Sequence, residues 1–414
     1  MKSIILAALG NEQPGDDCPD QMSEKNSRIA VIGCGSAGCH TVSRLKRIGV
    51  SGAHTIAIDS DLYKLKQCCA DTRLFMYSVK KSLSENISFR FGPEEWPKRI
   101  AVIGCGDTGN IVVTRLYETG IRGVLTVALN TTGTGKRPDL VQADELVFID
   151  MPLRKGFIEY EPPYNGVFSA IMAKSRLEKL LHHTDLCIVI ANLGEGSGSG
   201  AAPIVAELAK KMGNVVMGIG IYPFHLPVYL RRRITDRGLA ALRAAADSVL
   251  VVDLYTLVPE YGALSITDFV QKIHQIIAQT VKLTCDMITE PSLVCVDHQE
   301  MYDILQQHGD IVLMRGTGTG DDRVYRVVLE CRKHPLPSRD IADAKGCIIS
   351  FYGGMDFTLE DALEAGELLT KECDPDASVI WGARAGEHLD GQIQVCALFT
   401  GLDSRWKPGT SQIS

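Results

Sequence analysis

The sequence predicts an α/β protein with a Rossmann-like, doubly wound parallel sheet, a long central helix and then a smaller α+β domain. Three observations predict this class. A unit made of a strand, a glycine-rich turn, a helix and a second strand occurs twice, and apolar strands and helices then alternate as far as Val252. Residues 265–289 carry apolar side chains at helical spacing and contain no Gly or Pro, which predicts a single long helix.

The repeated unit is visible as an ungapped alignment of residues 28–61 with residues 99–132, in which 16 of the 34 positions are identical by direct comparison. The likeness continues from ADTRLFM at Ala70 to ADELVFI at Ala143. A short connection follows the first copy, whereas the second copy leads into a long α/β continuation. We therefore expect a duplication in which the first copy is an appendage to the second.

The remaining elements follow from apolar periodicity and turn residues. After the second copy we expect a helix near 175–182, a strand at 186–191, a glycine loop at 194–200, a helix at 201–212, a strand at 215–221, a helix at 231–246 and a strand at 248–252. Pro291 ends the long helix. Beyond it we expect strands at 311–314, 324–329, 347–351, 378–381 and 393–399, with a helix near 359–369.

These elements predict a division of the chain into parts. The expected parts are a flexible tail at 1–27, the extra repeat at 28–98, a nucleotide-binding domain at 99–264, the central helix at 265–290, the α+β domain at 291–402 and a second tail at 403–414.

Composition excludes several classes of protein. The chain of 414 residues is 45% hydrophobic and 22% charged, with 43 basic and 50 acidic residues and a net charge of -7, which argues against extended disorder and against nucleic-acid binding. The only apolar run near the start, residues 4–9, is far too short to span a membrane, so we expect a cytoplasmic protein. None of the 13 cysteines forms a CxxC pair, so no metal site is predicted.

Three glycine-rich segments lie between an expected strand and an expected helix. GCGSAG from Gly33 and GCGDTG from Gly104 satisfy G-x-G-x-x-G, and NLGEGSGSG begins at Asn192. Backbone N–H groups of such turns bind phosphate at a helix N-terminus, and the last two together suit a di- or triphosphate. Two alternatives remain open: the glycines serve only tight strand–helix packing, or the first copy, with Asp59 and Asp61, holds the nicotinamide cofactor of an oxidoreductase.

At this point the sequence resembles a known family. GEGSGSGAAPIVAELAKKMG, from Gly194, is similar to the signature loop and following helix of FtsZ, a tubulin-like GTPase, with serines where threonines are usual. YPF at Tyr222, ITEPSLVCVDHQEM at Ile288 and DAKGCIISFYGG at Asp343 continue the resemblance in the family's order. It extends over residues 99–402 and implies the tubulin/FtsZ fold.

The resemblance also implies a nucleotide site. The residues implied to hold GTP, together with Mg²⁺, are Gly104, Gly106, Asp107, Thr108, Gly109 and Asn110 of the first loop, Gly194, Glu195, Gly196, Ser197, Gly198, Ser199 and Gly200 of the second, and Arg231 and Gln275. Asp297 and Glu300 match the acids that complete hydrolysis on the next subunit of a head-to-tail filament. The implied partners are further copies of the chain or a second FtsZ, and the implied place is the division site.

Some positions depart from the family pattern. Cys295 stands in place of an asparagine, Gln275 in place of the aspartate that reads guanine, and Pro227 in place of a glutamate. DHQE at Asp297 also fits a helix capping box. The chain has no recognisable C-terminal peptide for membrane adaptors. A second interpretation therefore stands beside the GTPase: a nucleotide-binding partner of a true FtsZ that does not hydrolyse.

Overall fold

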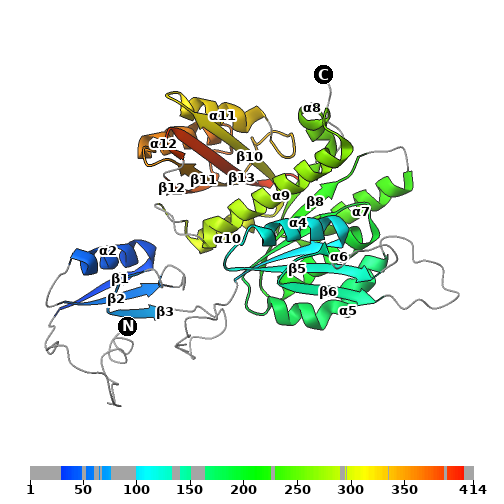
Figure 1. The fold of residues 1–414 in the computed structure, drawn as a ribbon, viewed down its shortest axis with the longest axis horizontal. Coiled ribbons are helices and arrows are strands. Elements are labelled where there is room, and N and C mark those ends of the chain that lie inside the picture. The colour runs from blue at the N-terminus through cyan, green and yellow to red at the C-terminus, as the bar shows by residue number, and fades with distance from the viewer. Residues whose placement is uncertain are drawn as a thin grey trace, which may run out of the picture. The chain divides into compact units, whose positions relative to one another are not determined.

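The computed structural model describes most of the chain, namely residues 29–48, 53–59, 65, 68–75, 99–132, 140–150, 164–224, 229–289, 294, 296–333, 335–386 and 389–404. The chain falls into two compact units, Met1–Arg90 and Phe91–Ser414, and Figure 1 labels many of their helices and strands. Within the described residues, no helix has the length and apolar character needed to cross a membrane.

The first unit is a small parallel sheet with the strand order β1-β2-β3. Its elements are β1 (Ile29–Cys34), α2 (Gly35–Ile48), β2 (Ala53–Asp59) and β3 (Thr72–Phe75). A small cluster of buried side chains from Cys39, Ala57, Leu65 and Cys68 forms its core. The described part of this unit is thus a minimal α/β unit.

The second unit begins with the same arrangement. Its first elements are β4 (Ile100–Cys105), α4 (Gly106–Glu118), β5 (Val124–Thr132) and β6 (Glu145–Asp150). Ile29 pairs with Ala53 in the first copy, and Ile100 pairs with Val124 in the second, so the two strand pairs have the same register. The duplication seen in the sequence is therefore also a structural duplication.

The third strand of each copy is attached by the same contact. In the first copy, the backbone N–H and the hydroxyl of Thr55 donate to one oxygen of Asp71, at 2.8 and 2.6 Å. In the second copy, Thr126 donates the same two hydrogen bonds to Asp144, both at 2.8 Å. These aspartates belong to the ADT and ADE motifs, which explains why the likeness continues past the aligned segment.

The sheet then extends on the other side of β4. The added elements are α5 (Tyr164–Leu181), β7 (Leu186–Asn192), α6 (Gly196–Lys211), β8 (Val215–Tyr222), α7 (Tyr229–Ala245) and β9 (Ser248–Asp253). The order β9-β8-β7-β4-β5-β6 is parallel throughout. This is the predicted doubly wound sheet, and the strand order reverses between β4 and β7, where such folds bind ligands.

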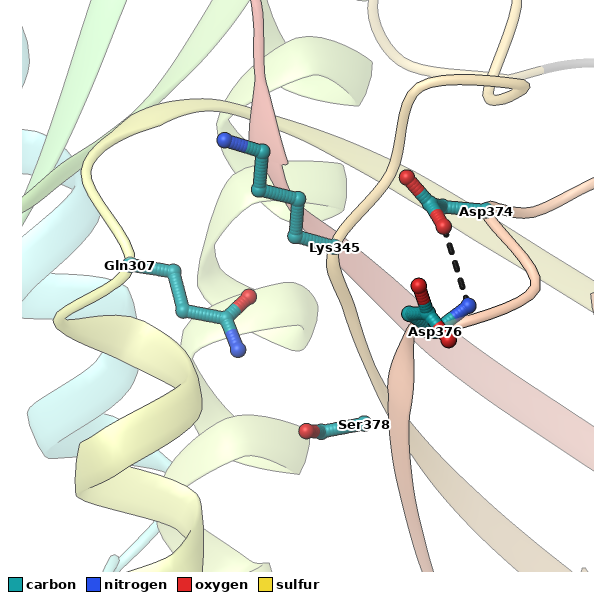
Figure 2. A pocket seen from close by; sticks show the side chains of 5 residues that line it. All are labelled: Gln307, Lys345, Asp374, Asp376 and Ser378. Carbon is teal, nitrogen blue, oxygen red and sulfur yellow. Dashed lines mark hydrogen bonds between the residues drawn. The ribbon is translucent and has the colours of Figure 1, made fainter.

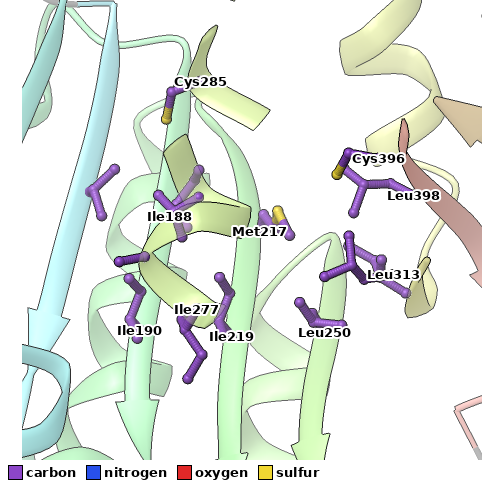
Figure 3. Packing of buried hydrophobic residues seen from close by; sticks show 14 of the residues in the cluster. Ile188, Ile190, Met217, Ile219, Leu250, Ile277, Cys285, Leu313, Cys396 and Leu398 are labelled. Carbon is purple, nitrogen blue, oxygen red and sulfur yellow. The ribbon is translucent and has the colours of Figure 1, made fainter. Parts of the chain in front are cut away.

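One face of the sheet is covered by the predicted central helix. After η2 (Leu254–Leu257) and α8 (Val258–Tyr261) comes α9 (Ile266–Thr289), the long helix beside α4 in Figure 1. Its Ile273, Ile277 and Val281 join α4 and strand residues in a buried cluster. Figure 3 shows Ile277 and Cys285 of α9 together with side chains of three strands, among them Ile188 of β7 and Leu250 of β9. Helices α5, α6 and α7 cover the opposite face.

The C-terminal part continues the same sheet. Its elements are α10 (His298–Leu305), β10 (Gly309–Thr319), α11 (Arg323–Lys333), β11 (Gly346–Gly353), α12 (Leu359–Thr370), β12 (Ser378–Ala385) and β13 (Gln392–Leu402). β10 pairs with β9 only at Gly309, Asp310 and Ile311. These pairs extend the hydrogen-bonded order to ten strands, β12-β11-β13-β10-β9-β8-β7-β4-β5-β6, a continuity that the sequence did not predict.

A buried ion pair strengthens this junction. Asp310 at the start of β10 is fully buried, and Arg243 of α7 donates to both of its carboxylate oxygens, at 2.8 and 2.5 Å. Arg339 lies 3.5 Å from the same carboxylate. Burial raises the pKa of Asp310, and the two arginines oppose that rise.

Three elements differ from the sequence prediction. Residues 324–329, predicted as a strand, lie in α11, because Val324, Val327, Val328 and Cys331 are buried at helical spacing. The valine run was misleading because β-branched residues favour strands only when packing agrees. Helix α5 begins at Tyr164 rather than near 175, and α6 begins at Gly196 rather than 201, since small residues line their buried faces and weaken the apolar pattern.

Candidate functional site

Two glycine turns meet at the point where the strand order reverses. β4 and β7 are neighbours, and each passes directly from its carboxyl end into a glycine turn and a helix N-terminus. Gly106 has φ +81°, and a Cβ built on it would lie 3.2 Å from the backbone nitrogen of Gly198. The first loop, residues 104–110, is therefore in direct contact with the second, residues 194–200.

Close backbone packing makes two of the glycines essential. A Cβ on Gly104 would lie 2.4 Å from the carbonyl oxygen of Gly109, and a Cβ on Gly198 would lie 2.2 Å from that of Asn192. Because real Cβ atoms do not approach so closely, only glycine fits either position. The first turns of α4 and α6 are thereby brought together, with two helix N-termini that can receive an anion.

Side chains at the strand ends hold the loops in place. Asn130 at the end of β5 donates from Nδ2 to Asp107 at 2.6 Å, and the hydroxyls of Thr131 and Ser197 lie 3.5 Å apart. In the second loop, the backbone N–H of Gly194 donates to the hydroxyl of Ser199 at 2.7 Å. β5 therefore contacts both loops, through adjacent residues.

Several buried amide atoms at the site have no hydrogen-bond partner among the described residues. Asn110, the fifth residue of α4, is 1% exposed, and neither its Oδ1 nor its Nδ2 has a partner in the described part of the chain; the same holds for Oδ1 of Asn192. A buried polar group without a partner is costly, and a polar ligand would remove that cost. The unpaired atoms and the two helix N-termini thus fit a phosphorylated ligand.

One residue near the second loop was not predicted from the sequence. Asn165 lies in the first turn of α5, and its Oδ1 is buried without a partner among the described residues. The next residue, Gly166, packs against the second loop, where a Cβ would lie 2.4 Å from the carbonyl oxygen of Gly196. The only signal in the sequence was an Asn-Gly pair after the residues 151–163, and nothing local links that pair to a loop thirty residues later.

Comparison with known proteins identifies the family. Residues 99–258 match the tubulin/FtsZ family GTPase domain, and residues 309–403 match the FtsZ family C-terminal domain. Cell division protein FtsZ 2 of Methanocaldococcus jannaschii is 38% identical over 337 residues, covering 80% of this chain and 87% of the relative. The chain belongs to the FtsZ family. FtsZ 2 of Halobacterium salinarum strain R1 is 35% identical over 313 residues, which are 76% of this chain and 79% of that one.

Solved structures agree with this assignment. An FtsZ dimer from M. jannaschii superposes with a TM-score of 0.67 at 27% identity, covering 75% of this chain and 90% of that one. A GTPγS-bound CetZ2 protofilament from Haloferax volcanii shares the fold, with a TM-score of 0.61 at 22% identity over 74% of this chain and 93% of that one. The predicted tubulin/FtsZ fold and the family GTPase domain are thus confirmed.

The two remaining nucleotide residues expected for an FtsZ lie apart from the loops in sequence. Arg231 belongs to α7, but its side chain is outside the described residues. Gln275 lies on α9 with an exposed side chain, between the buried His274 and Ile276. The departures at Pro227 and Cys295 fall outside the described residues, as do residues 151–163. The contribution of these positions stays a prediction.

The two acids expected to assist hydrolysis belong to another region of the fold. α9 has 24 residues and is about 36 Å long, and its last residue, Thr289, packs on Gly123, where a Cβ would lie 3.2 Å from the Thr289 methyl carbon. Gly123 immediately precedes β5, at the amino end of the strand, whereas both glycine loops follow carboxyl ends. Asp297 and Glu300 follow α9 and are exposed.

The segment before these acids is anchored to the C-terminal strands. Val294 forms an isolated bridge with Ala383 of β12, and the side chain of Val296 packs where a Cβ of Gly382 would be. In the sheet order, five strands separate β12 from β7. Asp297 caps α10 by accepting from the N–H groups of Gln299 and Glu300, which is the Asp297 half of the predicted capping box. A cap does not exclude a second role for an exposed carboxylate.

A surface pocket of about 300 Å³ lies elsewhere, in the C-terminal part of the chain. Figure 2 shows its lining residues, Gln307, Lys345, Asp374, Asp376 and Ser378, with the Asp376 N–H donating to Asp374 at 2.9 Å. The lining contains one lysine and two aspartates, so the pocket has no excess of positive charge for phosphate. No group of three or more possible metal ligands occurs among the residues that the structure describes.

Proposed function

We propose that this protein binds GTP between its two glycine loops, assembles head to tail into filaments and hydrolyses the nucleotide at the subunit interface during cell division. The carrying observation is that the two loops meet where the strand order reverses between β4 and β7. Buried amide atoms of Asn110 and Asn192 there have no partner among the residues that the structure describes. Relatives named as cell division proteins support the cellular role, and the division site is the proposed place.

The separation of the acids from the loops supports a site shared by two subunits. Asp297 and Glu300 follow the far end of α9, so within one chain they are remote from the turns that hold phosphate. In a head-to-tail contact, two different surfaces meet, and repetition of the contact generates an open filament. Across that contact the carboxylates would orient and polarise the attacking water. Mg²⁺, when bound, neutralises charge on the phosphates.

Phosphate release measured against protein concentration tests the proposal. A site shared by two subunits makes specific activity rise with assembly, so release from GTP should appear above a threshold concentration at which polymer sediments. ATP serves as the comparison for base preference, since Gln275 replaces the usual aspartate. A GTP-dependent rate that stays proportional to protein concentration from high dilution, without polymer, would refute hydrolysis at an interface.

Mixing two inactive variants tests the shared site directly. Asp297→Asn keeps the loops, whereas Gly198→Ala damages the second loop and keeps the acids. If both variants enter filaments at random, about one quarter of the interfaces in an equimolar mixture combine an intact loop with intact acids. We expect the mixture to regain up to that fraction of wild-type release. Additive, negligible rates in mixed filaments would place the acids and the loop on the same subunit.

A second candidate function is a nucleotide-binding partner of another FtsZ without turnover. The capping role of Asp297 and the substitutions Cys295 and Pro227 favour it, because they remove or reassign groups that hydrolysis would use. In this case nucleotide binds, no phosphate is released at any concentration, and the chain sediments with filaments of a hydrolysing FtsZ. Phosphate release by the purified chain alone would exclude it.

A further inference from the structure

Two cysteines belong to the core of the first unit. Among the described residues, the buried cluster of this unit consists of Cys39, Ala57, Leu65 and Cys68. The described part of the unit is small, and small units that bury little apolar surface commonly gain stability from covalent links between distant segments. A bond between the two cysteines would therefore have a large effect on the stability of this unit.

Cys39 stands where the second unit has Asn110, the buried amide of its glycine turn. Both are the fifth residue of the helix that follows the turn, so the two positions correspond in sequence and in structure. The thiol of Cys39 donates to the carbonyl oxygens of Gly33 and Ile58, at 3.7 and 3.5 Å. The side chain of Cys39 thus points toward the carboxyl ends of β1 and β2, inside the unit.

The same helix holds Cys68. The thiol of Cys68 donates to the carbonyl oxygen of Cys39 at 3.1 Å, and the side chains of the two cysteines are also in hydrogen-bond contact. Ser43, one turn further along α2, donates from its hydroxyl to Sγ of Cys68 at 2.9 Å. Ser43 Oγ also accepts from the backbone N–H of Cys69 at 2.9 Å. These contacts place one sulfur beside the other.

Folding thus brings together two sulfurs that lie 29 residues apart in the chain. In a disordered chain, the entropy lost on closing a loop of this length opposes the formation of a disulfide. The folded unit has already lost that entropy, so the bond between these sulfurs is favoured there. For the same reason the bond stabilises the folded unit relative to its opened form.

We propose that Cys39 and Cys68 form a reversible disulfide, which fastens α2 to the segment before β3 and makes the stability of the first unit depend on the surrounding thiol–disulfide balance. The oxidant is a small-molecule disulfide of the glutathione class. The thiolate of one cysteine attacks it and releases one small thiol, and the second cysteine then attacks the mixed disulfide and releases the other. One small disulfide is reduced to two thiols, which take the two protons of the oxidised cysteines.

Burial makes this reaction slow while the unit is closed. Burial, followed by the charge of Asp59 and the neighbouring Cys68, raises the pKa of Cys39 to about 12. Little of the reactive thiolate is therefore present at neutral pH. The oxidant must reach the sulfurs during local opening of the unit, so the bond forms slowly and, once formed, makes that opening rarer.

The test uses the full chain, equilibrated in buffers with increasing ratios of oxidised to reduced glutathione. Free thiols are then alkylated, and the tryptic peptides are identified by mass spectrometry. We expect a link between peptides 29–44 and 67–73 that dithiothreitol removes. Each peptide also contains a second cysteine, Cys34 in one and Cys69 in the other, so variants must assign the bond.

Two double variants remove equal numbers of thiols and make the assignment. The variant Cys34→Ser with Cys69→Ser is the control and should form the link at the same glutathione ratio as wild type. The variant Cys39→Ser with Cys68→Ser should not form it. A link that persists in the second variant, or no link in wild type at any ratio, would overturn the proposal.

Hydrogen exchange of wild type measures the effect on stability and needs no variant. Oxidation should slow the exchange of backbone N–H groups in β1, α2 and β2 by about a hundredfold, because the disulfide restricts the opened unit. Exchange in β4 and β7 of the second unit should be the same in both states. Equal exchange of the first unit with and without the link would show that the bond does not control its stability, and would also overturn the proposal.

Discussion

The side chain of Asp297 closes the first turn of α10 by accepting a hydrogen bond from the backbone N–H of Gln299 at 2.8 Å. A second, longer bond comes from the N–H of Glu300 at 3.3 Å. The residue proposed to act on a neighbour's nucleotide therefore also starts a helix in its own subunit. Substitutions must separate these two roles.

Asp297→Asn should keep the cap and lose the carboxylate. Asparagine caps helices about as well as aspartate, whereas replacement of a cap by alanine costs about 1 kcal/mol. We therefore expect Asp297→Asn to retain the wild-type midpoint in urea and wild-type nucleotide affinity, with phosphate release reduced to background. Asp297→Ala should lose release and also stability.

The comparison of these two variants distinguishes the roles. If only the alanine variant loses phosphate release, and the loss matches its loss of folded protein, then Asp297 serves only as a helix cap. Gln299→Ala is a suitable control, because it leaves the backbone N–H that bonds to Asp297 in place and removes only the contact of Gln299 with Asp303.

Two glycine-to-alanine substitutions should have opposite effects on stability. In Gly198→Ala the new Cβ would lie 2.2 Å from the carbonyl oxygen of Asn192, so we expect a loss of about 1–3 kcal/mol and weaker nucleotide binding. In Gly366→Ala, within α12, the Cβ meets no described atom within 4 Å, and the higher helix propensity of alanine should add about 1 kcal/mol. Urea unfolding and a nucleotide titration measure both. If the Gly198→Ala protein bound nucleotide with wild-type affinity, the close packing of the second loop at Gly198 would not be needed for nucleotide binding.

A chain that begins at residue 91 should bind nucleotide as the full chain does. The second unit contains both meeting loops and the three large buried clusters. In the first copy, Gly35 has φ +70° like its counterpart Gly106, but a Cβ on it would meet no described atom within 4 Å. Titration of both chains with a fluorescent nucleotide decides the matter, with circular dichroism to verify folding. A folded but non-binding short chain would assign the site to the first copy.

His274 should make stability fall as the pH decreases from neutral. The side chain is 6% exposed on α9, and burial, followed by the nearby Arg115, lowers its pKa from 6.5 to about 4. Between these values the unfolded chain binds a proton that the folded chain does not, so the free energy of unfolding decreases with falling pH. Each unit is worth 1.36 kcal/mol, which predicts a loss of about 2 kcal/mol by pH 5.

The measurement is urea unfolding at pH 7.5, 6 and 5 for wild type and for His274→Gln, which does not titrate in this range. The variant should lose less stability between pH 6.5 and pH 5, and the difference between the two proteins is the contribution of His274. Parallel pH profiles of wild type and variant would show that the imidazole titrates normally in the folded chain.

Local order along the chain was largely predictable from the sequence. The alignment of residues 28–61 with 99–132 implied two copies of one unit, and both form the same strand pairing with the same Thr–Asp contact. The glycine spacing after β4 and β7 placed two turns at helix starts, because close backbone packing at Gly104 and Gly198 permits no other residue. Family motifs added the fold, which the comparisons confirmed.

The sequence by itself determined the local helices, strands and turns. It could do so because the spacing of apolar residues, the turn residues and the helix starts are properties of consecutive residues. What only the tertiary structure decided depends on contacts between distant segments. Strand pairing placed β4 beside β7 and β9 beside β10, packing turned residues 324–329 into a helix, and α5 brought Gly166 against the second loop. These outcomes arise from burial and hydrogen bonding across the whole fold, which no local pattern encodes.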